Sequence, residues 1–287
     1  MRLNNSITTT GAVAATVTVA FAIFIYAAAE WSAPASTPLS TETCSNQTTT
    51  IIPQIAVGSF DDGVTTYATT IHILNTSGAA SAVSARFYKD RPNESSVPND
   101  LGLNSPTALT GGHLPSTPLQ SDAAFVIRGG GKPKSESIGW GKVTACGAVS
   151  VSTVFEIRDN VSGRLYSRAA IGASPANLSK FIIPRIRDSR AGLESAFAVV
   201  NTGTADAILA AELVDADGKT VGSEEIVMAG GSHKTQFVNE LFSKVVDTSS
   251  DRTFQYVRFS SSSASFAAAG IAVEGKIQTN IPVERIQ

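Results

Sequence analysis

Apolar and polar residues alternate with a period of two over much of the chain after residue 50. The clearest stretches are residues 71–90 and 197–218, and each contains a run in which every second residue is apolar. This period is typical of a β-strand with one buried face. The residues predicted to share the buried face are Val83, Ala85 and Phe87 in the first stretch and Leu209, Ala211 and Leu213 in the second.

The two stretches belong to one longer repeat. Each follows an Ile-Ile-Pro segment, and in each the sequence Asn-Thr begins a glycine-containing turn. Each is followed by a Gly-Gly turn with a histidine just after it, and then by a strand, a turn of small residues and a second strand. The matched landmarks are residues 51–58 with 181–188, Asn75-Thr76 with Asn201-Thr202, residues 109–115 with 227–234, and residues 139–159 with 254–275.

Short strands separated by Gly, Asn, Asp and Ser turns favour β-sandwich domains, and each copy has about the size of an immunoglobulin-like sandwich. Residues 236–246 are the one segment in which we expect a short helix. The predicted fold class is all-β, with two tandem immunoglobulin-like β-sandwich domains preceded by an N-terminal hydrophobic export helix. The predicted parts are a signal peptide or membrane anchor (1–31), a Ser/Thr/Pro-rich linker (32–50), domain 1 (51–178) and domain 2 (179–287).

Four short motifs carry a resemblance that covers residues 51–287. They are the Asn-Thr-x-x-Ala turn at Asn75 and Asn201, ELVDADGK (212–219), FVNELF (237–242) and TNIPV (279–283). With these motifs the chain resembles uncharacterised exported bacterial proteins with duplicated β-sandwich repeats. The resemblance implies no activity and supplies no catalytic residue.

The N-terminus indicates export. No charged residue occurs between Arg2 and Glu30, and residues 11–29 are mostly apolar. A basic start, an apolar run and small residues at 27–29 and 33–35 are typical of a cleaved signal peptide. The run is also long enough to span a bilayer, so an uncleaved membrane anchor stays open. Either way we expect the rest of the chain to be secreted, periplasmic or tethered to the membrane by this segment.

The two cysteines, Cys44 and Cys146, are candidates for a disulfide because exported proteins meet an oxidising environment. The alternative is two unpaired thiols. Two cysteines alone make a poor metal site, since zinc takes four clustered ligands. The chain has 16% charged residues and a net charge of −2 without a basic block, so we expect no nucleic-acid partner and no membrane contact beyond the N-terminal segment.

No residue pattern indicates catalysis, a metal or a cofactor. His113 and His233 each follow a Gly-Gly turn and read as solvated turn residues. Ser232 and His233 are neighbours, and on a strand neighbours point to opposite faces, so they do not predict a nucleophile–base pair. Asp215-Ala-Asp-Gly reads as a hairpin turn rather than a calcium loop, because its continuation lacks the expected ligands.

Trp140 is the candidate ligand contact, because exposed aromatic rings stack on sugars. A role in the core competes with this interpretation. The loops at 91–107 and 128–137 differ most between the copies and are the other candidate surface.

The predicted function is that of a non-catalytic exported cell-envelope or secreted binding or structural protein. The alternative is a carbohydrate-binding accessory module, and a hydrolase ranks after it. The partner would be a protein or a surface polysaccharide, and the sequence leaves the oligomeric state open.

Overall fold

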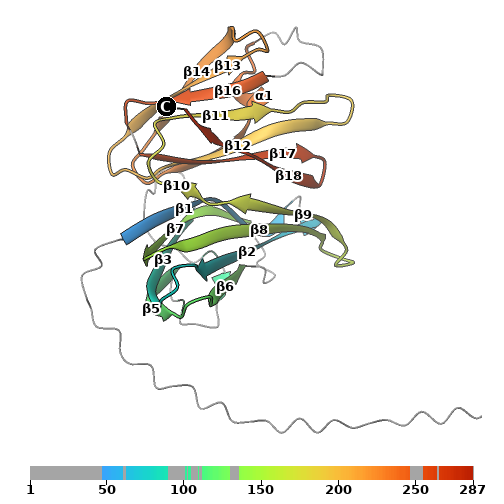
Figure 1. Cartoon of the computed structure of the whole chain (residues 1–287). Helices are drawn as coiled ribbons and strands as arrows, with labels where there is room; N and C mark the ends of the chain where they lie inside the picture. Colours follow the sequence, from blue (N-terminus) through green and yellow to red (C-terminus); the bar gives the residue numbers. More distant parts are fainter. Residues whose placement is uncertain are drawn as a thin grey trace, which may run out of the picture. The chain divides into compact units, whose positions relative to one another are not determined.

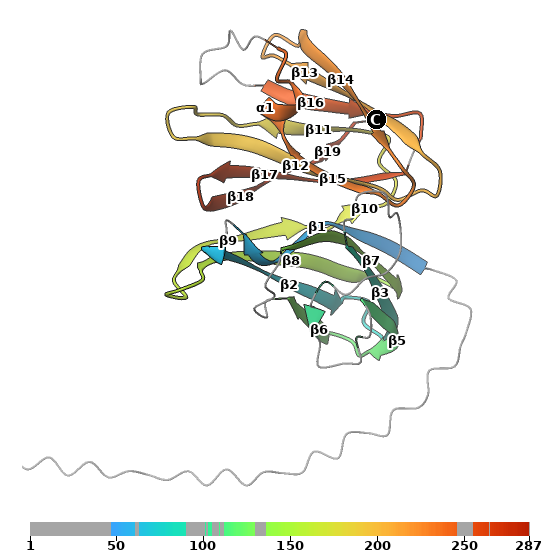
Figure 2. The ribbon, with the colours of Figure 1, turned by 180° about the vertical axis from the view of Figure 1, so that it is seen from behind.

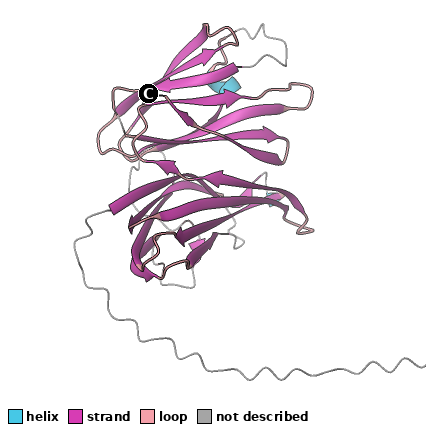
Figure 3. Ribbon diagram, in the orientation of Figure 1, coloured by secondary structure: helices cyan, strands magenta, loops and turns pink. Residues whose placement is uncertain are grey.

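The computed structural model describes residues 47–60, 63–89, 101, 103–104, 109, 112–129, 136–245, 255–263 and 265–286. Strands β1 to β19 make up most of these residues, and the described part has one helix, α1 (Val238–Leu241; Figure 3). The all-β class is therefore confirmed, and α1 falls where the sequence predicts a short helix. The predicted export segment lies outside the described residues, and β1 already begins at Gln47, inside the predicted linker.

Strands β1 to β10 form one hydrogen-bonded group with two layers (Figure 1). One layer has the order β10-β1-β7-β3-β5, and the other has the order β9-β8-β2-β6-β4. The last residues of β1 also pair with β2, which joins the layers at one corner. The bounds are β1 (Gln47–Phe60), β2 (Thr65–Asn75), β3 (Ser81–Lys89), β4 (Leu103–Asn104), β5 (His113–Leu119), β6 (Ala124–Gly129), β7 (Ser137–Cys146), β8 (Val149–Asp159), β9 (Leu165–Gly172) and β10 (Ser174–Pro175).

Strands β11 to β19 form two further sheets, with the orders β14-β13-β16-β11-β19 and β15-β12-β17-β18 (Figure 2). Among the described residues, no strand ladder joins these sheets to β1–β10. The bounds are β11 (Lys180–Arg185), β12 (Leu193–Asn201), β13 (Ala207–Val214), β14 (Thr220–Met228), β15 (His233–Phe237), β16 (Gln255–Ser260), β17 (Phe266–Glu274), β18 (Ile277–Ile281) and β19 (Glu284–Arg285).

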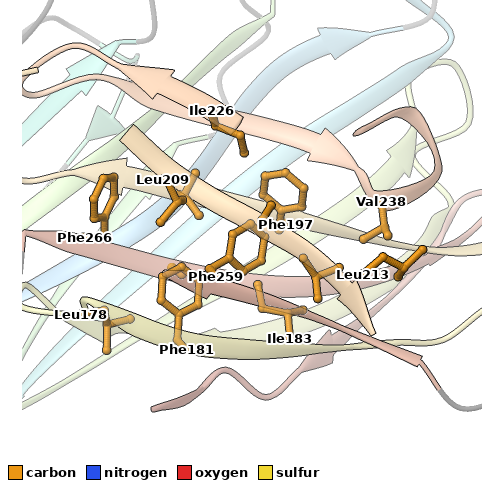
Figure 4. Close-up of a cluster of buried hydrophobic side chains, with 14 of the residues drawn as sticks. Leu178, Phe181, Ile183, Phe197, Leu209, Leu213, Ile226, Val238, Phe259 and Phe266 are labelled. Carbon is orange, nitrogen blue, oxygen red and sulfur yellow. The ribbon is translucent and has the colours of Figure 1, made fainter. Parts of the chain in front are cut away.

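Each group encloses its own apolar core. The core of β11–β19 centres on Phe259, whose ring stacks on Phe181 at a centroid distance of 4.9 Å and meets the edge of Phe197 at 5.2 Å (Figure 4). The core of β1–β10 is aliphatic apart from Phe87 and Phe125. The predicted inward faces are confirmed, since these residues are all at least 98% buried: Val83, Ala85, Phe87, Leu209, Ala211 and Leu213.

The two groups share one pairing scheme. In the first group β7 pairs with β1 and β3, β3 with β5, β2 with β6 and β8, and β8 with β9. In the second group β16 pairs with β11 and β13, β13 with β14, β12 with β15 and β17, and β17 with β18. Strand by strand, β1, β2, β3, β5, β6, β7, β8 and β9 correspond to β11 through β18 in order.

Matching side chains make matching hydrogen bonds in the two groups. The buried amide of Asn75 donates to the carbonyls of Ala79 and Leu119, and that of Asn201 donates to Ala205 and Met228. Each of these asparagines also accepts a hydrogen bond from the backbone N–H two residues later. Both side chains therefore tie the end of one strand to the turn that follows it.

The pairing scheme corrects one landmark of the sequence repeat. The turn at Gly231, which bonds to the Asn201 carbonyl, corresponds to the turn at Asp122, which bonds to the Asn75 carbonyl. Both residues adopt a positive φ, +72° for Gly231 and +59° for Asp122. The second Gly-Gly turn therefore precedes the counterpart of β6, whereas the first precedes β5, and His113 and His233 are not equivalent. Glycine pairs match locally by turn chemistry, whereas strand pairing sets the true register.

On the outer face of the sheet β15-β12-β17-β18, the residues of the two central strands are buried as well as those on the inner face. Three of them are alanines, and we call Ala198, Ala267 and Ala269 the alanine seam. They contact residues of the first group, among them Ala56 and Trp140. Small side chains let two sheets approach closely, so the seam packs the two groups together although each has its own core.

Candidate functional site

Trp140 lies inside the molecule. Its ring is stacked on Tyr88 at a centroid distance of 4.1 Å and packs with Ile51 and Val200 near the alanine seam. Only 5% of Trp140 is exposed. A platform for sugar stacking needs an exposed ring, and the ring of Trp140 is covered by its neighbours.

Cys146 ends strand β7, directly opposite Gln47 at the start of β1. No cysteine among the described residues is a free thiol. Cys44 lies outside the described residues, so the Cys44–Cys146 bridge stays a prediction. Most residues of the loops at 91–107 and 128–137 also lie outside the described residues.

The sequence predicts that His233 is a solvated turn residue. This prediction is wrong, because only 7% of the residue is exposed. Its Nε2 lies 3.0 Å from Oε1 of Gln54, and Thr235 donates a hydrogen bond to the same oxygen at 2.8 Å. Ser232 instead donates to the Ala229 carbonyl within its own turn. These contacts give His233 a place in the packing between the two strand groups.

An open depression of about 650 Å³ lies on the outer face of the layer that contains β2, β6, β8 and β9. These strands lie side by side in the pairing order β6-β2-β8-β9 (Figure 1). Every second residue of each strand points outward, because side chains alternate across a strand. The lining residues are Thr66, Ala68, Thr70, His72, Arg128, Gly129, Val154, Glu156, Arg158 and Arg168, and we call this site the arginine depression.

Glu156 organises one side of the arginine depression. Its Oε2 accepts hydrogen bonds from Nε and Nη2 of Arg158 at 3.0 and 2.8 Å. Its Oε1 accepts from Arg168, with Nε at 2.8 Å. One carboxylate therefore holds two guanidinium groups from neighbouring outward positions, and their side chains stay 40% and 56% exposed.

The protonation state of Glu156 follows from these contacts. Partial burial raises the pKa of Glu156, but the hydrogen bonds and positive charges of Arg158 and Arg168 outweigh it and hold the pKa below its usual value. Glu156 is therefore ionised at neutral pH, with both oxygens engaged. Such a carboxylate fixes arginines in place and does not supply a proton as a general acid would.

The β8–β9 hairpin positions Arg158 and Arg168, and Asp159 closes its turn. The Asp159 carboxylate accepts hydrogen bonds from the backbone of Ser162 and Val161 and from the Tyr166 hydroxyl, which lies 2.6 Å away. These bonds, the backbone N–H of Ser162 first among them, hold the pKa of Asp159 well below its usual range. The turn is thus stabilised by an ionised carboxylate.

Arg128 stands on the other side of the depression. Arg128 is on β6, directly opposite Thr70 of β2, and Thr70 is in turn opposite Val154 of β8. The floor between the arginines is made of short side chains, Ala68, Thr70 and Val154. The site therefore offers guanidinium groups around a low floor, an arrangement suited to binding oxyanions.

In the sequence, the residues of this site are recognisable only as outward positions of separate strands. Glu156, Arg158 and Arg168 occupy outward positions of strands that the period of two identifies. Their convergence with Arg128 depends on β6, β2, β8 and β9 becoming neighbours, which distant pairing decides. Within the described part of the chain, no group of three or more His, Cys, Asp or Glu side chains is placed to hold a metal ion.

The chain matches no protein-family model, and no curated protein matches it. Among the helices of the described residues, none has the length and apolar character that crossing a bilayer requires. The apolar run at residues 11–29 lies outside those residues.

Proposed function

We propose that this chain is a non-catalytic exported protein of the cell envelope or the secreted fraction, with a binding or structural role. The observation that carries the proposal is the arginine depression, an open site over β6, β2, β8 and β9 that is ringed by arginines. Its one carboxylate, Glu156, is engaged by Arg158 and Arg168, which supports a role in holding a partner over proton transfer by this carboxylate.

We further propose that the chain consists of two tandem immunoglobulin-like sandwiches derived from one ancestral unit. The shared pairing scheme and the matched roles of Asn75 and Asn201 support this duplication. One feature differs from the immunoglobulin strand order, in which the first strand joins the sheet of the second. Here β1 pairs with β7 along most of its length and meets β2 only at Gly58–Phe60.

Export is supported by the surroundings of Cys146. Gln47 pairs directly with Cys146, and Cys44 precedes Gln47 by three residues, which span at most about 10 Å of extended chain. Cys44 is therefore within reach of the Cα separation of about 4–7 Å that a disulfide needs. Such bridges persist in oxidising compartments, which agrees with an N-terminal export segment.

The test is the fate of the full chain expressed in a bacterial host. We expect it in the envelope or the medium, with a mass about 2 Da lower before reduction than after it. A matched variant, Phe21→Arg, interrupts the apolar run and should keep the chain inside the cell. Accumulation of the unaltered chain in the cytosol with two reduced cysteines would contradict the proposal.

A further inference from the structure

We propose that the arginine depression binds an acidic polysaccharide, a chain of sugars that carry carboxylate groups such as uronic acids. The inference rests on the proposed exported binding role and names the ligand class of that site. It follows from the charge, the spacing and the sheet position of the lining residues.

The charge of the site opposes that of the whole chain. Arg128, Arg158 and Arg168 bring three positive charges against the single negative charge of Glu156, whereas the chain as a whole has a net charge of −2. A positive depression on a slightly acidic protein selects an anionic ligand. Guanidinium groups match carboxylates because they donate two parallel hydrogen bonds.

The arginines are held ready for such a ligand. Glu156 occupies Nε and Nη2 of both Arg158 and Arg168, which fixes the direction of each guanidinium. The Nη1 of Arg158 donates a further hydrogen bond to the Gly163 carbonyl at 3.3 Å. The Arg168 side chain is more exposed, so the outer edge of its guanidinium faces solvent. Fixed donors lose less rotamer entropy when a ligand binds.

The spacing of the site suits a chain of sugars. Arg128 on β6 and Arg168 on β9 are separated by three inter-strand spacings, about 14 Å, and by two residues along the strands, about 7 Å, which together give about 16 Å. The hydroxyl of Thr70 and the imidazole of His72 line the space between and are hydrogen-bonding groups of the kind that sugar hydroxyls require. A short oligosaccharide spans this distance, whereas one monosaccharide does not.

The position of the strands favours a polysaccharide over an acidic peptide. An extended peptide binds a sheet by pairing with a free edge strand. The floor strands β2 and β8 are paired on both sides, so they offer no free edge. The lining also contains no aromatic residue among those described, and neutral sugars bind largely by stacking on such rings. Carboxylates are therefore the recognised groups.

The experiment is calorimetric titration of the full chain with hexameric oligogalacturonate at low salt. The control ligand is the same hexamer with its carboxylates methyl-esterified. We expect binding of the acid form that weakens as salt is added, and at least tenfold weaker binding of the ester. Equal binding of both forms, or binding of neither, would overturn the inference, and an acidic peptide that binds in place of the hexamer would overturn it as well.

Variants locate the binding. Arg168→Gln and Arg128→Gln should each weaken binding about tenfold, and the pair together should abolish it. The matched control is Arg258→Gln, because Arg258 also pairs with a glutamate on an outer sheet face and is 40% exposed, as Arg158 is. Unchanged binding in the depression variants, or equal loss in Arg258→Gln, would contradict the site.

These variants alter exposed side chains, so their far-UV circular dichroism and thermal midpoints should match the parent chain. The outcome is separable from the test of export. A chain that is exported and oxidised but ignores the hexamer retains the proposed function and loses this ligand, whereas a cytosolic reduced chain loses the proposed function whatever it binds.

Discussion

Asn201 and Asn75 provide the sharpest test of the architecture, because each closes a strand end from a fully buried position. Asn201 donates to the carbonyls of Ala205 and Met228 at 2.9 and 3.1 Å and accepts from the N–H of Gly203 at 3.0 Å. Replacing Asn201 by alanine removes all three hydrogen bonds and leaves the three backbone groups to find water.

The magnitude follows from these bonds. A net loss of about 1 kcal/mol for each hydrogen bond gives about 3 kcal/mol for Asn201→Ala, and the cost rises where a backbone group stays buried without a partner. Asn75 makes the same bonds and also accepts from the Ser77 hydroxyl at 2.7 Å, so Asn75→Ala should cost at least as much.

Urea unfolding followed by far-UV circular dichroism measures the loss, with the slope of the transition unchanged. Asn280→Ala is the control, because Asn280 is exposed on β18, and its loss should stay within about 0.5 kcal/mol. If Asn201→Ala and Asn75→Ala cost no more than Asn280→Ala, the two asparagines are not the structural counterparts that the shared pairing scheme requires.

Four further predictions follow from other contacts. Glu194→Ala removes the carboxylate whose Oε2 lies 3.0 Å from Nη2 of the buried Arg185. The change should lower the free energy of unfolding, measured in urea, by about 3–5 kcal/mol. The pKa of Asp159 lies below its usual 3.8, so the ionised carboxylate adds stability above about pH 4 that is lost as the pH falls. In Asp159→Asn, the thermal midpoint should therefore depend less on pH in this range. An unchanged slope of midpoint against pH would contradict the assignment. Ala198→Glu buries a charge in the alanine seam and should cost more than about 2 kcal/mol, with increased protease sensitivity; a parent-like urea midpoint would refute the seam. Replacing Cys44 and Cys146 together by serine should cost about 2–5 kcal/mol in oxidised protein, and no change in the midpoint would show that the two are not bonded.

The period of two was sufficient to predict the all-β class and the buried faces of single strands. Val83 and Leu209 are buried as their alternation predicts, because a strand exposes one face and hides the other whatever its neighbours are. Turn chemistry was equally local, since Asp215 accepts the backbone N–H groups of Asp217 and Lys219 in the β13–β14 hairpin.

Strand order, the seam and the arginine depression were decided by the tertiary structure. The Gly-Gly turns looked equivalent because glycine matches any tight turn, yet strand pairing aligns Gly231 with Asp122. The sequence indicates a solvated His233, but in the structure its ring contacts Gln54, which lies in another sheet.

The sequence by itself determined which residues each strand hides, because that depends on residues two apart. Tertiary structure alone decided which outward residues share one site, because Arg128 and Arg168 line the same depression only through β2 and β8, which pair across many intervening residues. Local alternation is set by backbone geometry, whereas the site depends on long-range pairing that no short window of the sequence contains.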